Sequence, residues 1–151
     1  MENVPQRTAL ASIYRKPLEL MEKFLPFGFF NPNYLQIFSL LASIFYLFIN
    51  NHHLNFYLIV LILLADWLDG AAARARKTIS KKGWMIDVVV DRISEGFIFA
   101  AHLNTDLGKI FFALYLINIF LSIYSIKSNK HLMLPLRFLW AFYLGIMILW
   151  K

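Results

Sequence analysis

The longest uncharged stretch of the chain runs from Phe24 to Ala65 and contains no Asp, Glu, Lys or Arg. A helix that crosses a bilayer needs about 20 mostly apolar residues, so this stretch is long enough for two such helices. Hydrophobic residues also make up 60% of all 151 positions. These features predict an integral membrane protein whose surroundings are membrane lipids, and we expect no nucleic acid among its partners.

Five apolar stretches are long enough, or nearly long enough, to cross a bilayer as helices. They cover about residues 34–50, 54–73, 84–103, 107–126 and 132–150. No internal repeat, low-complexity tract or linker separates them. We therefore expect one membrane domain over residues 1–151, folded as an all-α integral membrane helical bundle with about five transmembrane helices.

An amphipathic helix is predicted ahead of the first span, over residues 14–30. Pro17 suits a first helical turn, and apolar residues follow at helical spacing, namely Leu18, Met21, Phe24 and Leu25. Such a helix lies in the membrane interface. The chain then turns into the first span, because Pro32 biases Asn31 away from helical conformation.

Basic residues gather in alternate connectors and predict the orientation of the chain. They are Arg7, Arg15, Lys16 and Lys23 before the first span, Arg74, Arg76, Lys77, Lys81 and Lys82 between the second and third, and Lys127 and Lys130 between the fourth and fifth. Only Lys109 and Lys151 fall on the opposite side. By the positive-inside rule, the N-terminus and these connectors are cytoplasmic in a multi-pass protein.

Charged residues at fixed spacing interrupt the second and third apolar stretches. The pattern reads Asp66-x-x-Asp69-Gly70-x-x-Ala73-Arg74, then eight residues, then Gly83-x-x-x-Asp87-x-x-x-Asp91. At helical spacing the first two aspartates share one face, and the last two share one face of the next helix. Carboxylates are expensive at membrane depth, so four of them in adjacent helices indicate a functional site, which the orientation places on the cytoplasmic side.

The residue types of this pattern favour chemistry on a diphosphate. Carboxylates are suitable ligands for Mg²⁺ or Mn²⁺, which commonly share their ligands with substrate phosphates, and the chain has no cysteine for thiolate chemistry. Two carboxylates from each helix predict a pair of ions that neutralise a leaving group. Gly70 and Gly83 leave room for a substrate near the helices, and Arg74 is a fixed cation for phosphate oxygens. Asp91 lies deepest and is the candidate general base.

The same pattern resembles, without a departure, the signature of the CDP-alcohol phosphotransferase (phosphatidyltransferase) family. The resemblance implies that CMP is displaced from a CDP-linked lipid alcohol by a second alcohol, which attacks the β-phosphorus. By similarity, Asp66, Asp69 and Asp87 are metal ligands, and Asp91 is both a metal neighbour and the base. The similarity further implies CDP and phosphate contacts at Gly70, Ala73, Arg74 and Gly83, and Asn33 after Pro32 resembles a Pro-Asn pair of the family.

The acceptor alcohol is indicated less directly. Arg92 immediately follows the last aspartate, and in this respect the sequence resembles enzymes that transfer to inositol or inositol phosphate. Lys130, His131 and Arg137 are further cations that could bind an acceptor phosphate. Snorkelling interfacial cations are the alternative reading of these residues. Family members usually have six transmembrane helices and are commonly homodimers. We therefore expect a dimer. Either the final helix is absent, or the interfacial segment and the partner of the dimer complete the bundle.

Two other functions use intramembrane aspartates. A cation transporter needs polar residues that continue toward the outer side, where the second span is apolar from Leu54 to Ala65 apart from Asn55. A Mg²⁺-dependent polyprenyl-diphosphate transferase also uses aspartate pairs, but it does not account for the Gly-x-x-Ala-Arg run or for the position of Gly83. Release of CMP that depends on a divalent cation distinguishes these functions from the first.

Overall fold

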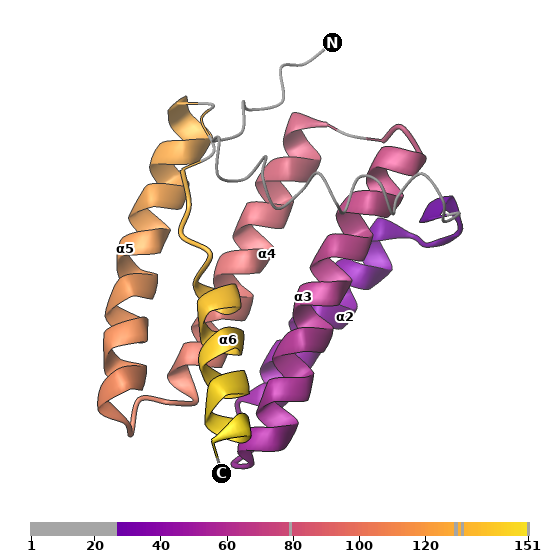
Figure 1. The fold of residues 1–151 in the computed structure, drawn as a ribbon. Coiled ribbons are helices and arrows are strands. Elements are labelled where there is room, and N and C mark those ends of the chain that lie inside the picture. The colour runs from indigo at the N-terminus through magenta and orange to yellow at the C-terminus, as the bar shows by residue number, and fades with distance from the viewer. Residues whose placement is uncertain (1–26, 79, 129, 131, 151) are drawn as a thin grey trace.

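The computed structural model describes residues 27–78, 80–128, 130 and 132–150. In this part of the chain a short 3-10 helix is followed by five α-helices (Figure 1). They are η1 (Phe27–Phe29), α2 (Pro32–Tyr46), α3 (His52–Ala75), α4 (Lys81–Ala100), α5 (Asp106–Ser128) and α6 (Leu136–Leu149). The predicted interfacial helix over 14–30 lies mostly outside the described residues, and within its range the structure shows η1 alone.

Side-chain caps define the starts of three helices. Asn31 is extended and its side chain accepts a hydrogen bond from the backbone of Asn33, while Pro32 opens the first turn of α2, as the sequence predicts. Asn51 caps α3 in the same way, and the side chain of Ser80 caps α4. Each cap satisfies a backbone N–H that has no partner within its own helix.

The helices pack as neighbours around α3 and α4. Helix α2 packs against both α3 and α4, α5 packs against α4, and α6 contacts α3 and α5. Figure 1 shows α6 between α5 and α3, beginning partway along the bundle instead of at its end. The C-terminal half of α3 and the N-terminal half of α4, which carry the aspartates, lie at the same end of the bundle, where the two helices are connected, and both helices pack against α2.

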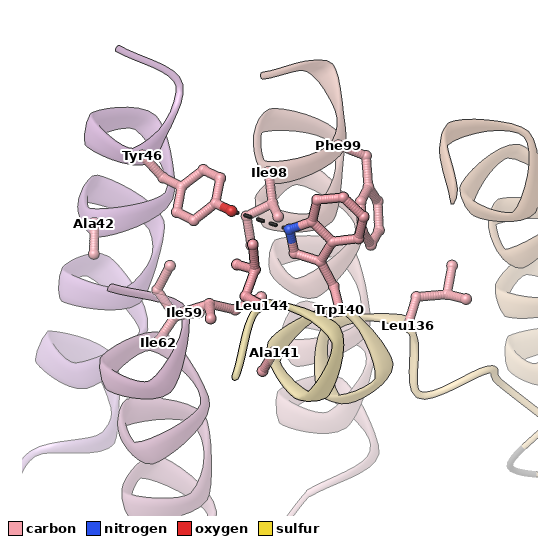
Figure 2. Close-up of a cluster of buried hydrophobic side chains, with 10 residues drawn as sticks. All are labelled: Ala42, Tyr46, Ile59, Ile62, Ile98, Phe99, Leu136, Trp140, Ala141 and Leu144. Carbon is pink, nitrogen blue, oxygen red and sulfur yellow. Dashed lines mark hydrogen bonds between the residues drawn. The ribbon is translucent and has the colours of Figure 1, made fainter. Parts of the chain in front are cut away.

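The apolar core lies toward the opposite end of the bundle, around Trp140 of α6 (Figure 2). The indole Nε1 of Trp140 donates a hydrogen bond to the hydroxyl of Tyr46 at 3.0 Å, and that hydroxyl is 2.9 Å from Nε2 of His102. Phe99 packs edge-on against the indole. These contacts join α2, α4 and α6 below the acidic motif.

The bundle is apolar outside and partly polar inside. Large apolar side chains of α2 face outward, among them Tyr34, Ile37, Phe38, Leu41 and Phe45. Buried polar residues include Ser39, Ser43, Asn55, Ser94, Glu95, Asn118, Ser122, Ser125 and Arg137. This distribution suits a helical bundle surrounded by lipid. The predicted all-α class is confirmed, and among the described helices α3 and α5 are long and apolar enough to cross a membrane, whereas α6 is apolar but shorter.

The last helix differs from its predicted range of 132–150, because α6 begins only at Leu136. The residues before it form a non-helical connector whose backbone is bound by side chains of α5. The N–H of Leu132 donates to Oγ of Ser125 at 3.1 Å, and the N–H of Leu134 donates to Oδ1 of Asn118 at 2.8 Å. Pro135 then occupies the cap position of α6. Side-chain partners from α5 thus replace the helical hydrogen bonds that the prediction assumed.

Candidate active site

The four aspartates of the motif come from two neighbouring helices, Asp66 and Asp69 from α3 and Asp87 and Asp91 from α4. All four are only partly exposed. Hydroxyl and amide groups of α2 hold one carboxylate from each helix. These contacts confirm that the two acidic faces lie close to a common third helix.

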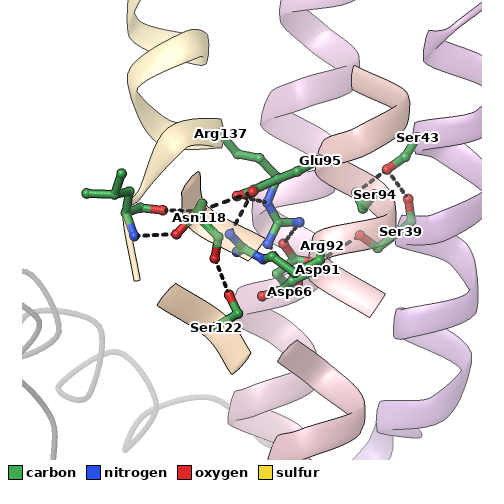
Figure 3. Close-up of polar contacts among 11 residues, drawn as sticks. Ser39, Ser43, Asp66, Asp91, Arg92, Ser94, Glu95, Asn118, Ser122 and Arg137 are labelled. Carbon is green, nitrogen blue, oxygen red and sulfur yellow. Dashed lines mark hydrogen bonds and ion pairs between the residues drawn. The ribbon is translucent and has the colours of Figure 1, made fainter. Parts of the chain in front are cut away.

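Ser39 of α2 donates its hydroxyl hydrogen to Oδ1 of Asp66 at 2.8 Å (Figure 3). One turn earlier on the same helix, the side-chain amide of Gln36 donates to the carboxylate of Asp87. Ser43 continues this face of α2 and donates to the backbone carbonyl of Ser39 at 2.8 Å, and its hydroxyl also bonds that of Ser94. Helix α2 therefore fixes the rotamers of two motif aspartates and ties itself to α4.

Arg137, in the first turn of α6, points into the acidic group. Its guanidinium forms an ion pair with Asp66, and its Nη2 lies 2.7 Å from Oδ1 of Asp91 (Figure 3). The residue is only 7% exposed, so it is not a snorkelling cation at the membrane interface. One buried guanidinium thus joins α6 to the acidic faces of α3 and α4.

Glu95 lies next to this ion pair and is almost completely buried, with 1% of its surface exposed. Its Oε2 is 2.7 Å from Nη1 of Arg92, and Oε1 is 3.9 Å from Nε of Arg137. The amide of Asn118 donates to Oε2 at 3.2 Å. Glu95 therefore binds Arg92 directly and lies near Arg137, one turn beyond Asp91 along the same face of α4.

Asn118 of α5 connects Glu95 to the connector that precedes α6. Its Oδ1 accepts from the N–H of Leu134, and its Nδ2 donates to the carbonyl of Leu134 at 3.0 Å and also to Glu95. Both hydrogen-bonding groups of one backbone residue are thereby satisfied by one side chain. This arrangement fixes where α6 begins, and hence where Arg137 is placed.

The predicted substrate contacts occupy the same end of the bundle but are less closely joined in this structure. Gly70, Ala73 and Arg74 follow Asp69 along α3 and are partly exposed. Gly83 lies in the first turn of α4, where its N–H donates to Oγ of Ser80 at 3.0 Å. A Cβ at position 83 would lie 3.2 Å from that oxygen, so Gly83 permits a close cap.

The remaining predicted residues lie at the surface. Asn33 is exposed in the first turn of α2. Lys130 is exposed in the α5–α6 connector, where its carbonyl accepts a hydrogen bond from Ser125. His131 is outside the described residues. Of the predicted acceptor cations that the structure describes, Arg92 and Arg137 lie beside Glu95, and Lys130 lies at the surface.

The donor chemistry of the motif suits a hard divalent cation, because all its candidate ligands are carboxylate oxygens. Within the described ranges, no group of three or more His, Asp or Glu side chains is arranged to hold a metal ion. In this structure the guanidinium of Arg137 is paired with both Asp66 and Asp91. The motif nevertheless has the type of ligand atom, carboxylate oxygen, that a hard divalent cation binds.

A helical bundle with an apolar exterior and a carboxylate-rich polar site at one end is typical of a membrane protein in which ionisable residues have a function. The chain belongs to the CDP-alcohol phosphatidyltransferase family, a membrane family of transferases whose model matches residues 29–148. An uncharacterized protein of Aquifex aeolicus (strain VF5) is 36% identical over 97 residues, which cover 61% of this chain. The chain spans 48% of the length of that relative. No solved structure matches the chain.

Sequence reasoning missed several residues that organise the site. Glu95 continues the four-residue spacing of Gly83, Asp87 and Asp91, and this spacing is the signal that would have found it. Gln36, Ser39 and Ser43 share one face of α2 at helical spacing. Asn118 is an isolated amide in an apolar stretch, and nothing in the sequence indicates that it binds the backbone of Leu134.

Proposed function

We propose that this protein transfers a substituted phosphate group from a CDP-linked lipid alcohol to an acceptor alcohol and releases CMP, as a step of phospholipid synthesis. Family membership supports the reaction class. The observation that carries the proposal is the concentration of the family's aspartates at one site, where α2 orients Asp66 and Asp87 and Arg137 pairs with Asp91.

In this proposal Asp66, Asp69 and Asp87, with Asp91 as a neighbour, hold two Mg²⁺ or Mn²⁺ ions. When bound, such ions polarise the phosphorus and neutralise charge on the leaving group. Gly70, Ala73, Arg74 and Gly83, with Asn33 at the start of α2, contact the CDP group. The chemistry of the donor set, which consists of carboxylate oxygens, supports this assignment.

Asp91 is proposed to accept the proton of the acceptor hydroxyl. The hydroxyl oxygen then forms a bond to the β-phosphorus, and the bond from that phosphorus to the bridging oxygen of CMP breaks. The carboxylate can act as a base only when Arg137 no longer neutralises it. The 2.7 Å contact between these two side chains therefore describes a resting state of the site.

The acceptor is proposed to be inositol or inositol phosphate, bound by Arg92 and Arg137 with help from Lys130. Two guanidiniums beside one carboxylate provide compensating charge for an anion that arrives next to a diphosphate. We further propose that the protein is a homodimer and that its N-terminus and active site face the cytoplasm, an orientation that the distribution of Lys and Arg supports.

The test uses the purified full chain with a labelled CDP-lipid, either CDP-diacylglycerol or CDP-archaeol. Inositol, inositol phosphate, serine, glycerol and glycerol phosphate are offered as acceptors, and products are identified by mass. CMP should appear only with a divalent cation and a suitable acceptor, and EDTA should abolish its release. Cation uptake into sealed vesicles, or transfer from a polyprenyl diphosphate without CMP release, would contradict the proposal.

A further inference from the structure

One guanidinium serves two of the proposed metal ligands. Arg137 pairs with Asp66 of α3 and lies 2.7 Å from Asp91 of α4. All three side chains are partly or wholly withdrawn from solvent. A divalent cation that bound these carboxylates would place a second positive charge next to the guanidinium, and the two would repel each other strongly in a medium of low dielectric constant. The guanidinium and the cation are therefore expected to compete for the same oxygens.

A buried guanidinium that leaves its partners needs another anion, because an unpaired buried charge is strongly destabilising. Glu95 is such an anion. Its Oε1 lies 3.9 Å from Nε of Arg137, which is longer than a hydrogen bond and leaves the contact open to tightening. Its other oxygen is already fixed by Arg92 and Asn118, so this carboxylate does not move away.

We propose that Arg137 is the resident counter-ion of Asp66 and Asp91 in the metal-free protein, and that Glu95 is the positioning residue that receives Arg137 when a divalent cation binds. This inference rests on the proposed metal site. Transfer of the guanidinium frees Asp91 to act as a base. The same movement brings Arg137 next to Arg92 at Glu95. Because these two arginines are proposed to bind the acceptor, the divalent cation must bind before the acceptor site forms.

The experiment measures Mn²⁺ binding to the full chain in detergent, without CDP-lipid, from the electron paramagnetic resonance signal of free Mn²⁺. Arg137→Gln should bind Mn²⁺ at least ~10-fold more tightly, because the competing charge is gone. Glu95→Gln should bind it about 10-fold more weakly, because Arg137 has no second partner. Asp106→Asn, which removes an exposed carboxylate paired with Lys109, is the control and should not change the affinity.

The double variant separates positioning from a general effect of charge. If Glu95 acts through Arg137, Glu95→Gln should change the Mn²⁺ affinity less than about 2-fold in the Arg137→Gln background. An equal loss in both backgrounds would overturn the role given to Glu95. Unchanged or weaker binding in Arg137→Gln would overturn the competition itself.

Two further outcomes separate this inference from the proposed function. A wild-type protein that binds no Mn²⁺ would overturn the proposed metal site and this inference together. If the wild-type protein binds Mn²⁺ and Arg137→Gln does not change the affinity, only the inference is overturned. If Arg137→Gln does not fold, arginine-selective ¹⁵N NMR of the wild-type protein decides the question. Mg²⁺ must then shift a buried guanidinium resonance, and unmoved resonances overturn the proposal.

Discussion

Arg137 and Asp91 face each other across the interface of α6 and α4, with Nη2 of the arginine 2.7 Å from Oδ1 of the aspartate. The same guanidinium pairs with Asp66 of α3. Helix α6, the shortest α-helix of the described bundle, therefore supplies a positive charge that pairs with one aspartate of α3 and one of α4. This relationship makes Arg137 the residue whose replacement is most informative about both stability and acceptor binding.

Replacement of Arg137 by alanine should raise the acceptor KM at least ~10-fold, or abolish transfer, while the affinity for CDP-lipid stays nearly unchanged. The reason is the loss of one of two cations proposed to bind the acceptor. Steady-state kinetics with each acceptor measure the effect. Lys109→Ala, an exposed cation at the other end of the bundle, is the control. Unaltered acceptor kinetics would remove Arg137 from the acceptor site.

The same replacement should lower stability. Asp66, Asp91 and Glu95 lose a buried partner, and removal of one member of a buried ion pair typically costs about 3–5 kcal/mol. Thermal unfolding in detergent measures this loss. Adding Asp66→Asn to Arg137→Ala should restore part of the lost stability, because it removes one of the uncompensated charges. A single variant as stable as the wild-type protein would contradict the observed ion pairs.

Asp69→Asn should reduce transfer about 10²-fold or more and remove its dependence on Mg²⁺ or Mn²⁺, because polarisation by a bound ion contributes several kcal/mol. The variant should still insert into membranes, which fractionation can verify. Asp106→Asn is the control, because it removes the same charge from an exposed residue outside the motif and should leave transfer unchanged. Substantial metal-dependent turnover by Asp69→Asn would contradict the two-ion proposal.

Asp91→Asn should lower transfer by about 100-fold, the loss typical for a missing general base, but should retain binding of CDP-lipid. A filter-binding assay with labelled CDP-lipid and a parallel assay of CMP release distinguish the two effects. If CDP-lipid binding disappears together with transfer, Asp91 is primarily a ligand of the cation, and the proton is accepted elsewhere.

Asn118→Leu should destabilise the protein by about 2–4 kcal/mol, because three hydrogen bonds to Leu134 and Glu95 are lost inside the bundle. Asn104→Leu is the control, because Asn104 is exposed in the α4–α5 turn. The loss is measured by thermal unfolding. Equal melting temperatures for the two variants would show that the connector does not depend on Asn118.

The sequence predicted the helical class and the approximate ranges of the helices because charges interrupt a strongly apolar chain in a regular way. The start of α6 was not predictable from hydropathy, since Leu132, Met133 and Leu134 are as apolar as the helix that follows. Pro135 was the only local signal of a boundary. What decides the boundary is a distant side chain, Asn118, whose contacts with the connector depend on how α5 packs.

The aspartates of the site were predictable because their spacing in the chain places them on one face of each of two consecutive helices. The partners of these aspartates were not. Ser39 is 27 residues from Asp66, and Gln36 is 51 residues from Asp87, so only tertiary structure brings them together. Arg137 was predicted as a cation for the acceptor, but its pairing with Asp66 follows from the late start of α6 and not from its position in the sequence.

The connector before α6 also constrains the order in which the protein can be assembled. Its backbone is bound by Ser125 and Asn118, so it can enter the bundle only after α5 is in place. Arg137 follows directly, and a lone arginine at this depth is costly to insert until its acidic partners are present. Because synthesis proceeds from the N-terminus, those partners on α3 and α4 have already left the ribosome when α6 emerges. Among the described helices, α3 and α4 thus form a partial template for the site before α6 joins them.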